Sequence, residues 1–506
     1  MINLLEKDQK NLDNLLFCIT LLLVFIMAVR VPLDSDMWWH LRAGQWTIQN
    51  GSPLLKDVFS YTRAGENWIN HSWLGEVVLY WFFENAGFWG LGLCVAITAV
   101  ASMGILYKIM EGGALFKAWF VILAAIICSF VWSPRPQIFS LLMFVILLGL
   151  IRTYRKHGGF QGTIWFFTLF VLWSNLHGGY GLGIFLLLFL LAGEILDSLL
   201  IPSNEGKRFG RLKKYFIWIL VALSGVLINP NGLNTLIVPF KTVGVQTLQS
   251  LIDEWASPDF HQLAMQPFLV LLFIVIFSFA YSKKTVSGFE IVGFLGFTYL
   301  ALVAKRNFAP FAIFATLTVG NHLPEIFVDI TKNLKNFFNQ HGNRMSRNQV
   351  VFPFNFRRVI NMTIIGLLGM VAIGKWFYVT HPVVVSAYEA RFYPQKAVAY
   401  LKEKGIPDGR LWNSYGWGGY LIWNMPETPV FVDGRTDLFG DEILKDWLNI
   451  LNTGEGWEEA VEKWKIGWFL IEPQQPVVEK LIKKGWRVLY EDEVSIVVAR
   501  EGDQSD

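Results

Sequence analysis

Long apolar stretches alternate with short polar loops from the N-terminus to about residue 379. Roughly 20 consecutive apolar residues can span a bilayer as a helix, and many stretches here meet or approach that length. The pattern therefore predicts a polytopic membrane protein with about eleven transmembrane helices. We expect them at residues 14–32, 88–109, 116–132, 137–152, 163–176, 180–200, 214–229, 266–282, 288–304, 308–323 and 359–379.

The region around the first span needs a finer interpretation. Residues 14–32 lack the small-residue cleavage site of a signal peptide, so we expect an uncleaved first span. The loop that follows, residues 33–87, is rich in acidic residues and tryptophan and contains a second apolar run at residues 73–84. That run is too short to cross a bilayer, which favours an interfacial helix.

The charges of the loops predict the orientation of the chain. Cytoplasmic loops of membrane proteins carry an excess of lysine and arginine. With the N-terminus in the cytoplasm, almost every basic cluster falls on the cytoplasmic side, and an odd number of spans leaves the C-terminus outside. Those clusters are Lys108 with Lys117, Arg152 to Lys156, Lys207 to Lys214, Lys283 with Lys284, and a basic loop at residues 332–358.

The pattern changes near residue 386. Residues 1–385 form the predicted transmembrane domain, and residues 386–506 read as a soluble domain in which helical and β-rich runs alternate. The fold class is therefore mainly α, a polytopic membrane protein with a C-terminal extracytoplasmic α/β domain. In that domain we expect helices at 394–404, 442–451, 458–465 and 477–484, and strands at 410–413, 429–433, 468–471, 486–490 and 494–499.

Composition agrees with this division and excludes some classes of function. Of the 506 residues, 53% are hydrophobic and 16% charged, with 22 tryptophans and 42 phenylalanines, which is unlike an ordinary soluble protein. The net charge of +3 gives no reason to expect a nucleic-acid partner. The three cysteines all lie in apolar stretches, and this excludes a disulfide framework or a zinc site.

The acidic loop after the first span is the leading candidate for chemistry. Asp34 and Asp36 stand where a membrane enzyme places a general base or a ligand of Mg²⁺ or Mn²⁺, with Asp36 the candidate metal ligand. The alternative is that these acids cap the next helix. His40 is expected on the same helix face as Asp36, and His71 lies further along the loop; each is either functional or an interfacial packing residue.

Other predicted outer loops contribute cations and a histidine turn. Arg135, Lys305 and Arg306 oppose the general charge trend, and binding of a phosphate group would explain them. Anchoring to lipid headgroups is the alternative, most plainly for Lys305. His177 begins a glycine-rich turn and is a candidate for substrate binding, although such a turn also serves simply to reverse the chain. The acidic-aromatic cluster at residues 253–255 is interpreted as a solvated loop.

The soluble domain carries two further candidate segments. Residues 413–420 are rich in aromatic residues and glycine, and Asp433 and Arg435 lie in a second segment, residues 433–437. Aromatic faces beside polar groups are suited to carbohydrate. The alternative is a structural corner in which Arg435 forms an ion pair with Asp433 or Asp437.

With these residues in view, the chain resembles the GT-C superfamily of polytopic membrane glycosyltransferases. It is similar more narrowly to a prokaryotic group within or beside that superfamily. The likeness in layout covers most of the chain. It is carried by residues 34–44, 57–62, 68–74, 417–420 and 432–437.

The resemblance implies a polyprenyl-phosphate-linked sugar as donor, transfer with inversion, and one or two acids in the first outer loop, which map onto Asp34 and Asp36. It also implies a bacterial or archaeal plasma membrane. A signature of the oligosaccharyltransferase type for acceptor recognition is not found, so the acceptor stays open.

The leading hypothesis is a hexosyl or pentosyl transferase that is embedded in the lipid bilayer and transfers the sugar at the outer face of the membrane. Arg135, Lys305 and Arg306 would hold the donor phosphate. Either Asp34 would be the general base for an acceptor hydroxyl, or Asp36 would bind a divalent cation, the only cofactor considered; the spacing does not assign these two roles. One alternative is a non-catalytic binding or assembly protein of surface-polymer biogenesis with the same fold. A transporter is less favoured, because transporters place polar residues near the middle of their spans, whereas here they gather at one face.

Overall fold

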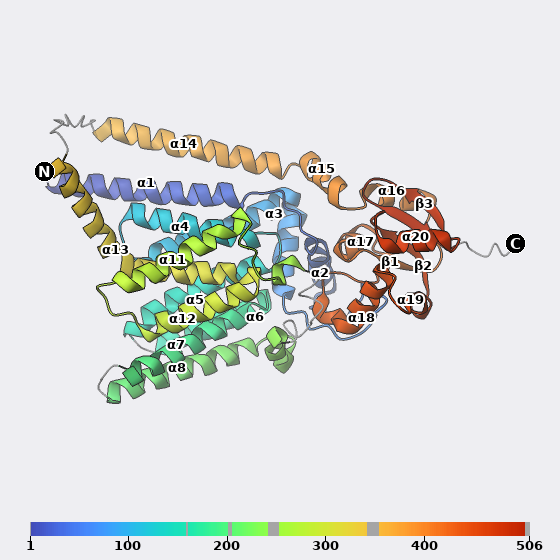
Figure 1. Cartoon of the computed structure of the whole chain (residues 1–506), viewed down its shortest axis with the longest axis horizontal. Coiled ribbons are helices and arrows are strands. Elements are labelled where there is room, and N and C mark those ends of the chain that lie inside the picture. Colours follow the sequence, from blue (N-terminus) through green and yellow to red (C-terminus); the bar gives the residue numbers. More distant parts are fainter. Residues whose placement is uncertain (1, 158–159, 201–204, 241–251, 342–353, 501–506) are drawn as a thin grey trace.

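The structure is a computed structural model that describes residues 2–157, 160–200, 205–240, 252–341 and 354–500. A bundle of long helices forms one end of the molecule, and a smaller domain with a β-sheet forms the other (Figure 1). The basic clusters of the described residues lie at the end of the bundle remote from the sheet domain.

Helices account for nearly all of the first part of the chain. Their bounds follow the apolar stretches, because an apolar helix satisfies its own backbone hydrogen bonds and can bury its side chains against neighbouring helices. They are α1 (Ile2–Ala28), α2 (Met37–Asn50), α3 (Trp73–Ile109), α4 (Ala114–Cys128), α5 (Gln137–His157), α6 (Phe160–Leu176), α7 (Tyr180–Leu200), α8 (Glu205–Val226), α11 (Gln266–Tyr281), α12 (Gly288–Val303), α13 (Phe308–His341) and α14 (Phe354–Val379).

Each of the eleven apolar stretches expected to span a membrane overlaps one of these helices, and five of them extend one to four residues beyond its end. Among the described residues, eight helices are long and apolar enough to cross a bilayer, and Gly162–Leu176 and Gly288–Val303 are shorter apolar helices. The remaining expected span, residues 214–229, lies mostly in α8. The predicted basic loop is helical as far as His341, and its residues 342–353 lie outside the described part of the chain.

The predicted interfacial helix is the first arm of α3. The helix changes direction at Gly87, whose φ of 55° and ψ of −140° are non-helical. In Figure 1 the first arm runs across the end of the bundle, while the second arm runs along it. α2 packs on the first arm so closely that a Cβ atom at Gly44 would clash with the carbonyl oxygen of Glu76. α2 and the first arm of α3 together lie beneath the sheet domain.

The sheet domain, which we call the outer domain after the side of the membrane predicted for it, contains the predicted mixture of helices and strands. Its four-stranded sheet has the order β1-β2-β4-β3, in which β1 and β2 are parallel and the other neighbours are antiparallel. The strands are β1 (Arg410–Asn413), β2 (Ile466–Ile471), β3 (Arg487–Glu491) and β4 (Ile496–Ala499). The helices are α15 (Pro382–Phe392), α16 (Gln395–Lys404), α17 (Gly418–Asn424), α18 (Thr436–Leu451), α19 (Trp457–Lys463) and α20 (Pro476–Lys483).

The strand predicted at residues 429–433 is wrong. This segment forms only an isolated bridge between Val430 and Ser60 of the first outer loop. The backbone N–H of Val430 donates to Phe59, and the amide side chain of Asn413 bonds the backbone of Phe431 and Val432. Contacts with the first outer loop and with the Asn413 side chain therefore satisfy the backbone groups that a sheet neighbour would otherwise bond.

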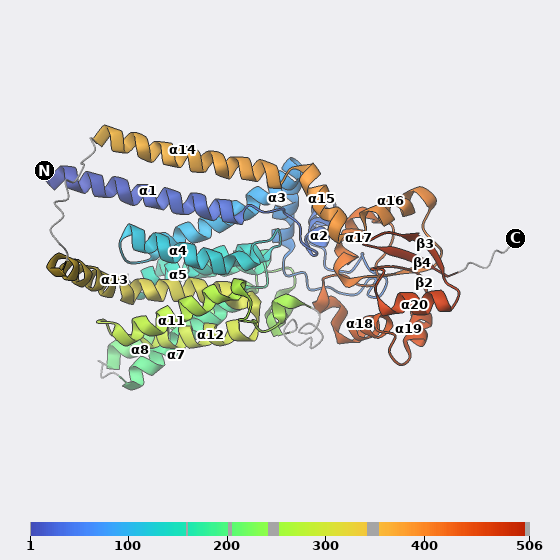
Figure 2. The ribbon, with the colours of Figure 1, turned by 45° about the horizontal axis from the view of Figure 1, so that its top comes forward.

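The two parts of the protein share one hydrophobic core. Trp38 of α2 makes edge-to-face contacts with Tyr393 and Tyr420 of the outer domain, with ring centroids 6.5 and 5.6 Å apart. Tyr61 of the first loop donates a hydrogen bond of 2.8 Å to the carbonyl of Leu411 in β1. Figure 2 shows α2 and α17 side by side at this junction. The outer domain is thus fixed on the end of the bundle.

Candidate functional site

A polar cavity of about 110 Å³ lies at the junction of the bundle and the outer domain. Its walls come from the first outer loop, the loops at the ends of the helices, and the segment that precedes α18. Most of the residues singled out in the sequence line it. The lining residues are Asp36, Trp39, His40, Trp68, Asn70, His71, Ser72, Glu76, Arg135, Gln137, His177, Ile252, Glu254, Trp255, Arg306, Gly434, Arg435, Thr436 and Asp437.

Arg135 lies at the centre of a cluster of carboxylates. Its Nη1 donates to Asp36 Oδ2 at 2.9 Å, its Nε lies 3.2 Å from Asp34 Oδ2, and its Nη2 pairs with Glu254. Asp36 also accepts a hydrogen bond of 3.2 Å from the indole of Trp39. Asp36 and Glu254 line the cavity, whereas Asp34 contacts Arg135 from outside it. Asp34 therefore positions Arg135.

The acids do not cap α2 through their side chains. Asp36 occupies the N-cap position without a side-chain capping bond, and Asp34 Oδ1 accepts from the backbone N–H of Asp36 at 3.0 Å. The capping interpretation is therefore wrong for both residues. Their carboxylates turn instead to Arg135, a partner that lies between α4 and α5.

Burial and charge shift the proton affinities within this cluster. Burial, against the opposing charge of Arg135 and with a smaller contribution from Asp34, raises the pKa of the Asp36 carboxyl to about 6. The Asp36 side chain nevertheless keeps 22% of its surface exposed. Burial alone would lower the pKa of Arg135, but Asp34, Glu254 and Asp36 together raise it above its usual value. Arg135 is thus a permanent cation, and Asp36 can exchange a proton near neutral pH.

His40 faces a buried carboxyl across the floor of the cavity. As expected, it lies one helical turn after Asp36, and its backbone N–H donates to the Asp36 carbonyl at 3.2 Å. The ring nitrogen Nδ1 lies 3.0 Å from Glu76 Oε1, and Glu76 Oε2 accepts from the Asn70 amide at 2.8 Å. Burial holds the pKa of His40 well below its usual value, so the ring itself is a poor cation.

His177 presents a defined tautomer to the cavity. Its Nδ1 accepts from the backbone N–H of Gly179 at 3.0 Å, and it lies 2.8 Å from the hydroxyl of Ser140, which in turn accepts from Trp173. Burial holds the pKa of His177 well below its usual value. The neutral ring therefore carries its proton on Nε2 and can donate it in a hydrogen bond. The ring of His71 lies 5.9 Å away.

Arg306 is the lining cation that keeps its charge available. Its guanidinium lies over the Trp255 ring, 4.2 Å from the centroid, and no carboxylate lies within ion-pair distance of it among the described residues. The neighbouring Lys305 behaves differently, because it is buried, pairs with Asp253 and does not line the cavity. Of the two cations predicted together, only Arg306 reaches the site.

Arg435 is held in a buried ion-pair network. It donates to both oxygens of Asp433, at 2.8 and 2.7 Å, and to Asp57 of the first outer loop at 2.7 Å. Asp433 does not line the cavity. The contacts therefore support the structural alternative for residues 433–437, in which Arg435 pairs with Asp433. The bond from Arg435 to Asp57 also joins the outer domain to the first outer loop.

The glycine between these residues closes the wall of the cavity. A Cβ atom at Gly434 would clash with Asp36 Oδ1 and lie 2.9 Å from the indole nitrogen of Trp39. Only a residue without a side chain allows the outer domain to approach Asp36 so closely. The site is thus built from both domains.

The aromatic segment 413–420 is part of the core. Trp417 and Tyr420 are buried, and the Trp417 indole donates to the carbonyl of Phe392 at 2.8 Å. Tyr420 stacks on Tyr393 with ring centroids 5.0 Å apart. These aromatic faces are covered and do not form the carbohydrate surface expected from the sequence.

The described residues contain no group of three or more histidine, cysteine, aspartate or glutamate side chains arranged to hold a metal ion. Asp36, the predicted metal ligand, contacts Arg135 and Trp39 instead. The residues present do not fit a metal site in this arrangement, and a divalent cation stays a prediction for experiment.

Several lining residues were not predicted as site residues. Glu254 was interpreted as part of a solvated loop, which is wrong, since it pairs with Arg135. Glu76 and Asn70 occur in the acidic loop, but nothing in their spacing distinguishes them from its other polar residues. Glu76 is fully buried in the apolar run 73–84, and a carboxylate within an apolar helix was the available signal.

Comparison with solved structures identifies the fold. The oligosaccharyltransferase AglB from Archaeoglobus fulgidus, solved with an inhibitory peptide and a dolichol-phosphate, matches with a TM-score of 0.52 and 13% identity over 90% of this chain and 69% of its own. ArnT from Cupriavidus metallidurans, bound to undecaprenyl phosphate, matches with a TM-score of 0.52 and 12% identity over 96% of this chain and 98% of its own. The chain has the fold of these GT-C membrane glycosyltransferases and is a multi-pass membrane protein.

No family model matches the sequence, and no curated protein matches it. The likeness is therefore one of fold.

Proposed function

We propose that this protein is an integral membrane glycosyltransferase that moves a sugar from a polyprenyl-phosphate-linked donor to an acceptor at the outer face of a bacterial or archaeal plasma membrane. The observation that carries the proposal is the convergence of Asp36, Arg135 and Arg306 on one cavity. These residues come from three different loops, and folding alone does not require them to meet. Two solved proteins of the same fold hold a polyprenyl phosphate, which is the product expected of such a donor.

Asp36 is the general base. The acceptor atom attacks the anomeric carbon of the sugar, the bond between that carbon and the phosphate oxygen breaks, and the acceptor proton passes to Asp36. A carboxylate that titrates near pH 6 accepts a proton from an acceptor more readily than an ordinary surface aspartate does, since catalysis is most efficient when the pKa lies near the operating pH.

Arginine and histidine donors stabilise the leaving group. The donor phosphate gains one negative charge when the sugar leaves, and this charge develops where Arg135, Arg306 and the Nε2–H of His177 line the cavity. Donors fixed in place before the reaction stabilise such charge without having to reorganise. Arg306 is the first contact for the phosphate, because its charge is not neutralised by a carboxylate.

An apolar hollow next to the cavity suits the lipid tail. It measures about 520 Å³ and lies between the start of α3, the end of α6 and the segment after α8. Trp73 joins the two spaces, since it follows the cavity residue Ser72 and its indole donates to Asn175 at 2.7 Å. Apolar lining residues include Leu74, Val171, Leu172, Leu227 and Ile228. An isoprenoid chain would bury its methyl groups here.

Two buried polar atoms in the cavity wall suit the hydroxyl groups of the sugar. The indole nitrogen of Trp68 and the hydroxyl of Ser72 have no hydrogen-bond partner within the described structure. Buried polar groups usually find a partner, and a ligand hydroxyl would supply one.

Transfer of radiolabelled sugar from a panel of polyprenyl-phosphate sugars tests the proposal, using purified wild type, Asp36→Asn and Asp34→Asn with and without EDTA. We expect transfer or donor hydrolysis by wild type, loss in Asp36→Asn, and a smaller loss in Asp34→Asn. Inhibition by EDTA would add a metal to the site. Equal activity of wild type and Asp36→Asn would exclude the assigned base. If no donor turns over while a donor still binds, the protein is a non-catalytic binder with this fold.

A further inference from the structure

A second polar cavity lies in the opposite half of the bundle. It measures about 270 Å³ and is bounded by α5, the end of α3, the start of α12 and the middle of α13. Along α5, Arg152 lies 15 residues after Gln137, a residue of the first cavity, which is about 22 Å at the rise of an α-helix. We call this space the Glu290 pocket. Its side chains take no part in the chemistry proposed above.

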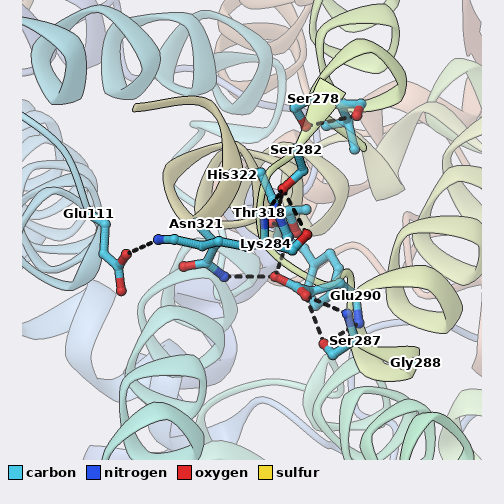
Figure 3. Close-up of polar contacts among 12 residues, drawn as sticks. Glu111, Ser278, Ser282, Lys284, Ser287, Gly288, Glu290, Thr318, Asn321 and His322 are labelled. Atoms are coloured by element: carbon cyan, nitrogen blue, oxygen red, sulfur yellow. Dashed lines mark hydrogen bonds and ion pairs between the residues drawn. The ribbon is translucent and has the colours of Figure 1, made fainter. Parts of the chain in front are cut away.

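Glu290 is fully hydrogen-bonded by the protein. Its Oε1 accepts from the Asn321 amide at 2.9 Å and lies 3.0 Å from His322 Nε2. Its Oε2 accepts from the backbone N–H and the hydroxyl of Ser287, at 2.9 and 2.7 Å. Figure 3 shows these contacts around one carboxylate. Glu290 therefore has no need of a further cation, and it fixes the shape of the pocket.

The second carboxylate of the pocket is shared by two cations. Glu111 pairs with Arg152 at 2.5 Å and with Lys284 at 3.2 Å. Arg152 also donates to the Asn321 amide oxygen at 3.2 Å, which links the two carboxylates through one network. Figure 3 shows Glu111, Lys284 and Asn321 in this arrangement. Among the residues that line the pocket, the cations Arg152, Arg155 and Lys284 outnumber the two carboxylates. Lys284 also lies 3.6 Å from Glu325, which is outside the lining.

Arg155 is the third of these cations. It lines the pocket, its guanidinium lies 5.7 Å from the centroid of the Phe289 ring, and no described carboxylate lies within ion-pair distance of it. A guanidinium held over an aromatic ring is oriented by that ring. Apolar side chains complete the wall: Leu148, Ile151, Phe314 and Leu317. An anion in this low-dielectric space would be attracted more strongly than at an open surface.

We infer that the Glu290 pocket binds a phosphate group, with Arg155 and Lys284 as its cations. A phosphate matches the forked donors of an arginine and the point charge of a lysine. The source is either the headgroup of an anionic phospholipid or a soluble phosphate. The basic loops predict that this half of the bundle faces the cytoplasm, and basic pockets between membrane helices on that side are known to hold lipid headgroups.

Isothermal titration of the detergent-solubilised full chain tests the inference and separates the two sources. Wild type is titrated with a short-chain phosphatidylglycerol, with the matching phosphatidylcholine, and with inorganic phosphate. A phospholipid site predicts binding of phosphatidylglycerol well above that of phosphatidylcholine. Binding of inorganic phosphate with equal or greater affinity would assign the pocket to a soluble phosphate. If none of the three binds, the inference is wrong.

Arg155→Gln is the decisive variant, and we expect it to weaken binding about tenfold or more, as the loss of a charge-assisted hydrogen bond does. Arg155→Lys keeps the charge and should bind with intermediate affinity, so it distinguishes a lost ligand contact from a misfolded pocket. Lys283→Gln is the matched control, because Lys283 neighbours Lys284 but is exposed, pairs with Asp329 and does not line the pocket. Equal binding by wild type and Arg155→Gln would overturn the assignment.

Discussion

Asp36 and Arg135 are 99 positions apart in the chain, yet Arg135 Nη1 donates to Asp36 Oδ2 at 2.9 Å. The first residue lies between α1 and α2, and the second between α4 and α5. Their pairing brings a carboxylate with a raised proton affinity beside a permanent cation, and both face the cavity that the outer domain covers.

Replacement of Asp36 by asparagine should lower the rate of sugar transfer by about 10²- to 10⁴-fold, which is the usual contribution of a general base. Asparagine keeps the shape of the side chain but cannot accept the proton. Single-turnover assays with a saturating polyprenyl-phosphate sugar measure the effect on the chemical step. Asp34→Asn is the matched control, since Asp34 also pairs with Arg135 but does not line the cavity. An equal loss in both variants would assign the effect to Arg135 instead.

Replacement of Arg306 by alanine should raise the KM for the donor by about tenfold or more, because a hydrogen bond to a charged group contributes roughly 1.5–3 kcal/mol. Arg306→Lys should be intermediate, since lysine keeps the charge but loses the planar fork. The comparison variant is Lys404→Gln, which removes an exposed charge remote from the cavity. Steady-state kinetics over a range of donor concentrations give KM, and an unchanged KM in Arg306→Ala would remove this residue from the phosphate site.

Transfer should weaken as the pH falls through about 6. Below its folded-state pKa of about 6, Asp36 becomes protonated and can no longer act as a base. His40 and His177 have pKa values well below their usual value and stay neutral in this range. A profile of kcat/KM against pH on both sides of 6 measures the effect. A profile without an inflection near 6 would contradict the role of Asp36.

Stability should move in the opposite direction over the same range. The pKa of Asp36 is raised from 3.8 to about 6, so the folded protein binds this proton more tightly than the unfolded chain does. The contribution of Asp36 to the free energy of unfolding therefore increases as the pH falls from about 6 toward 4. Comparison of thermal unfolding in wild type and Asp36→Asn isolates this contribution. If the wild type loses stability together with activity as the pH falls, and Asp36→Asn does not, then the folded structure requires the ionised form of Asp36.

Replacement of Gly434 by alanine should lower transfer by about tenfold to a hundredfold, because small displacements of catalytic groups have effects of this size. The added Cβ atom would clash with Asp36 and contact Trp39. Gly416→Ala is the control, since a Cβ atom there meets nothing within 4 Å. Activity and circular dichroism of both variants are compared. Full activity in Gly434→Ala would mean that the outer domain does not approach Asp36 during the reaction.

The apolar pattern predicted the bundle well because bilayer thickness sets the length of each helix and burial sets its composition. The same reasoning failed at residues 429–433, whose β-rich sequence bonds the first outer loop and Asn413 rather than a sheet strand. The sequence left two interpretations of Trp417 and Tyr420 open for a related reason, because aromatic residues in a domain junction have the same composition as those in a sugar site.

The candidate site was predictable in part. Asp36 was predicted because it is an acid at the end of an apolar span. Arg135 and Arg306 were predicted because they are cations in loops on the predicted outer side, where cations are uncommon. The sequence does not show that Asp36 lines the cavity while Asp34 does not, or that Arg306 lines it while Lys305 does not. These differences depend on the direction of each side chain, which the spacing of neighbouring residues in a loop does not determine. Glu254 could not be paired with Arg135 from the sequence, as their contact joins loops 119 positions apart.

The pairing of Arg435 with Asp57, over 378 positions of chain, has a consequence for biogenesis. The ribosome completes the acidic loop early and the residues that close the cavity almost last. A nascent or truncated chain would hold Asp36 open to water, without the wall that Gly434 and Arg435 provide. On the proposed function and the predicted orientation, catalytic competence would then arise only after export of the C-terminal domain, so that an incomplete chain could not consume lipid-linked sugar in the membrane.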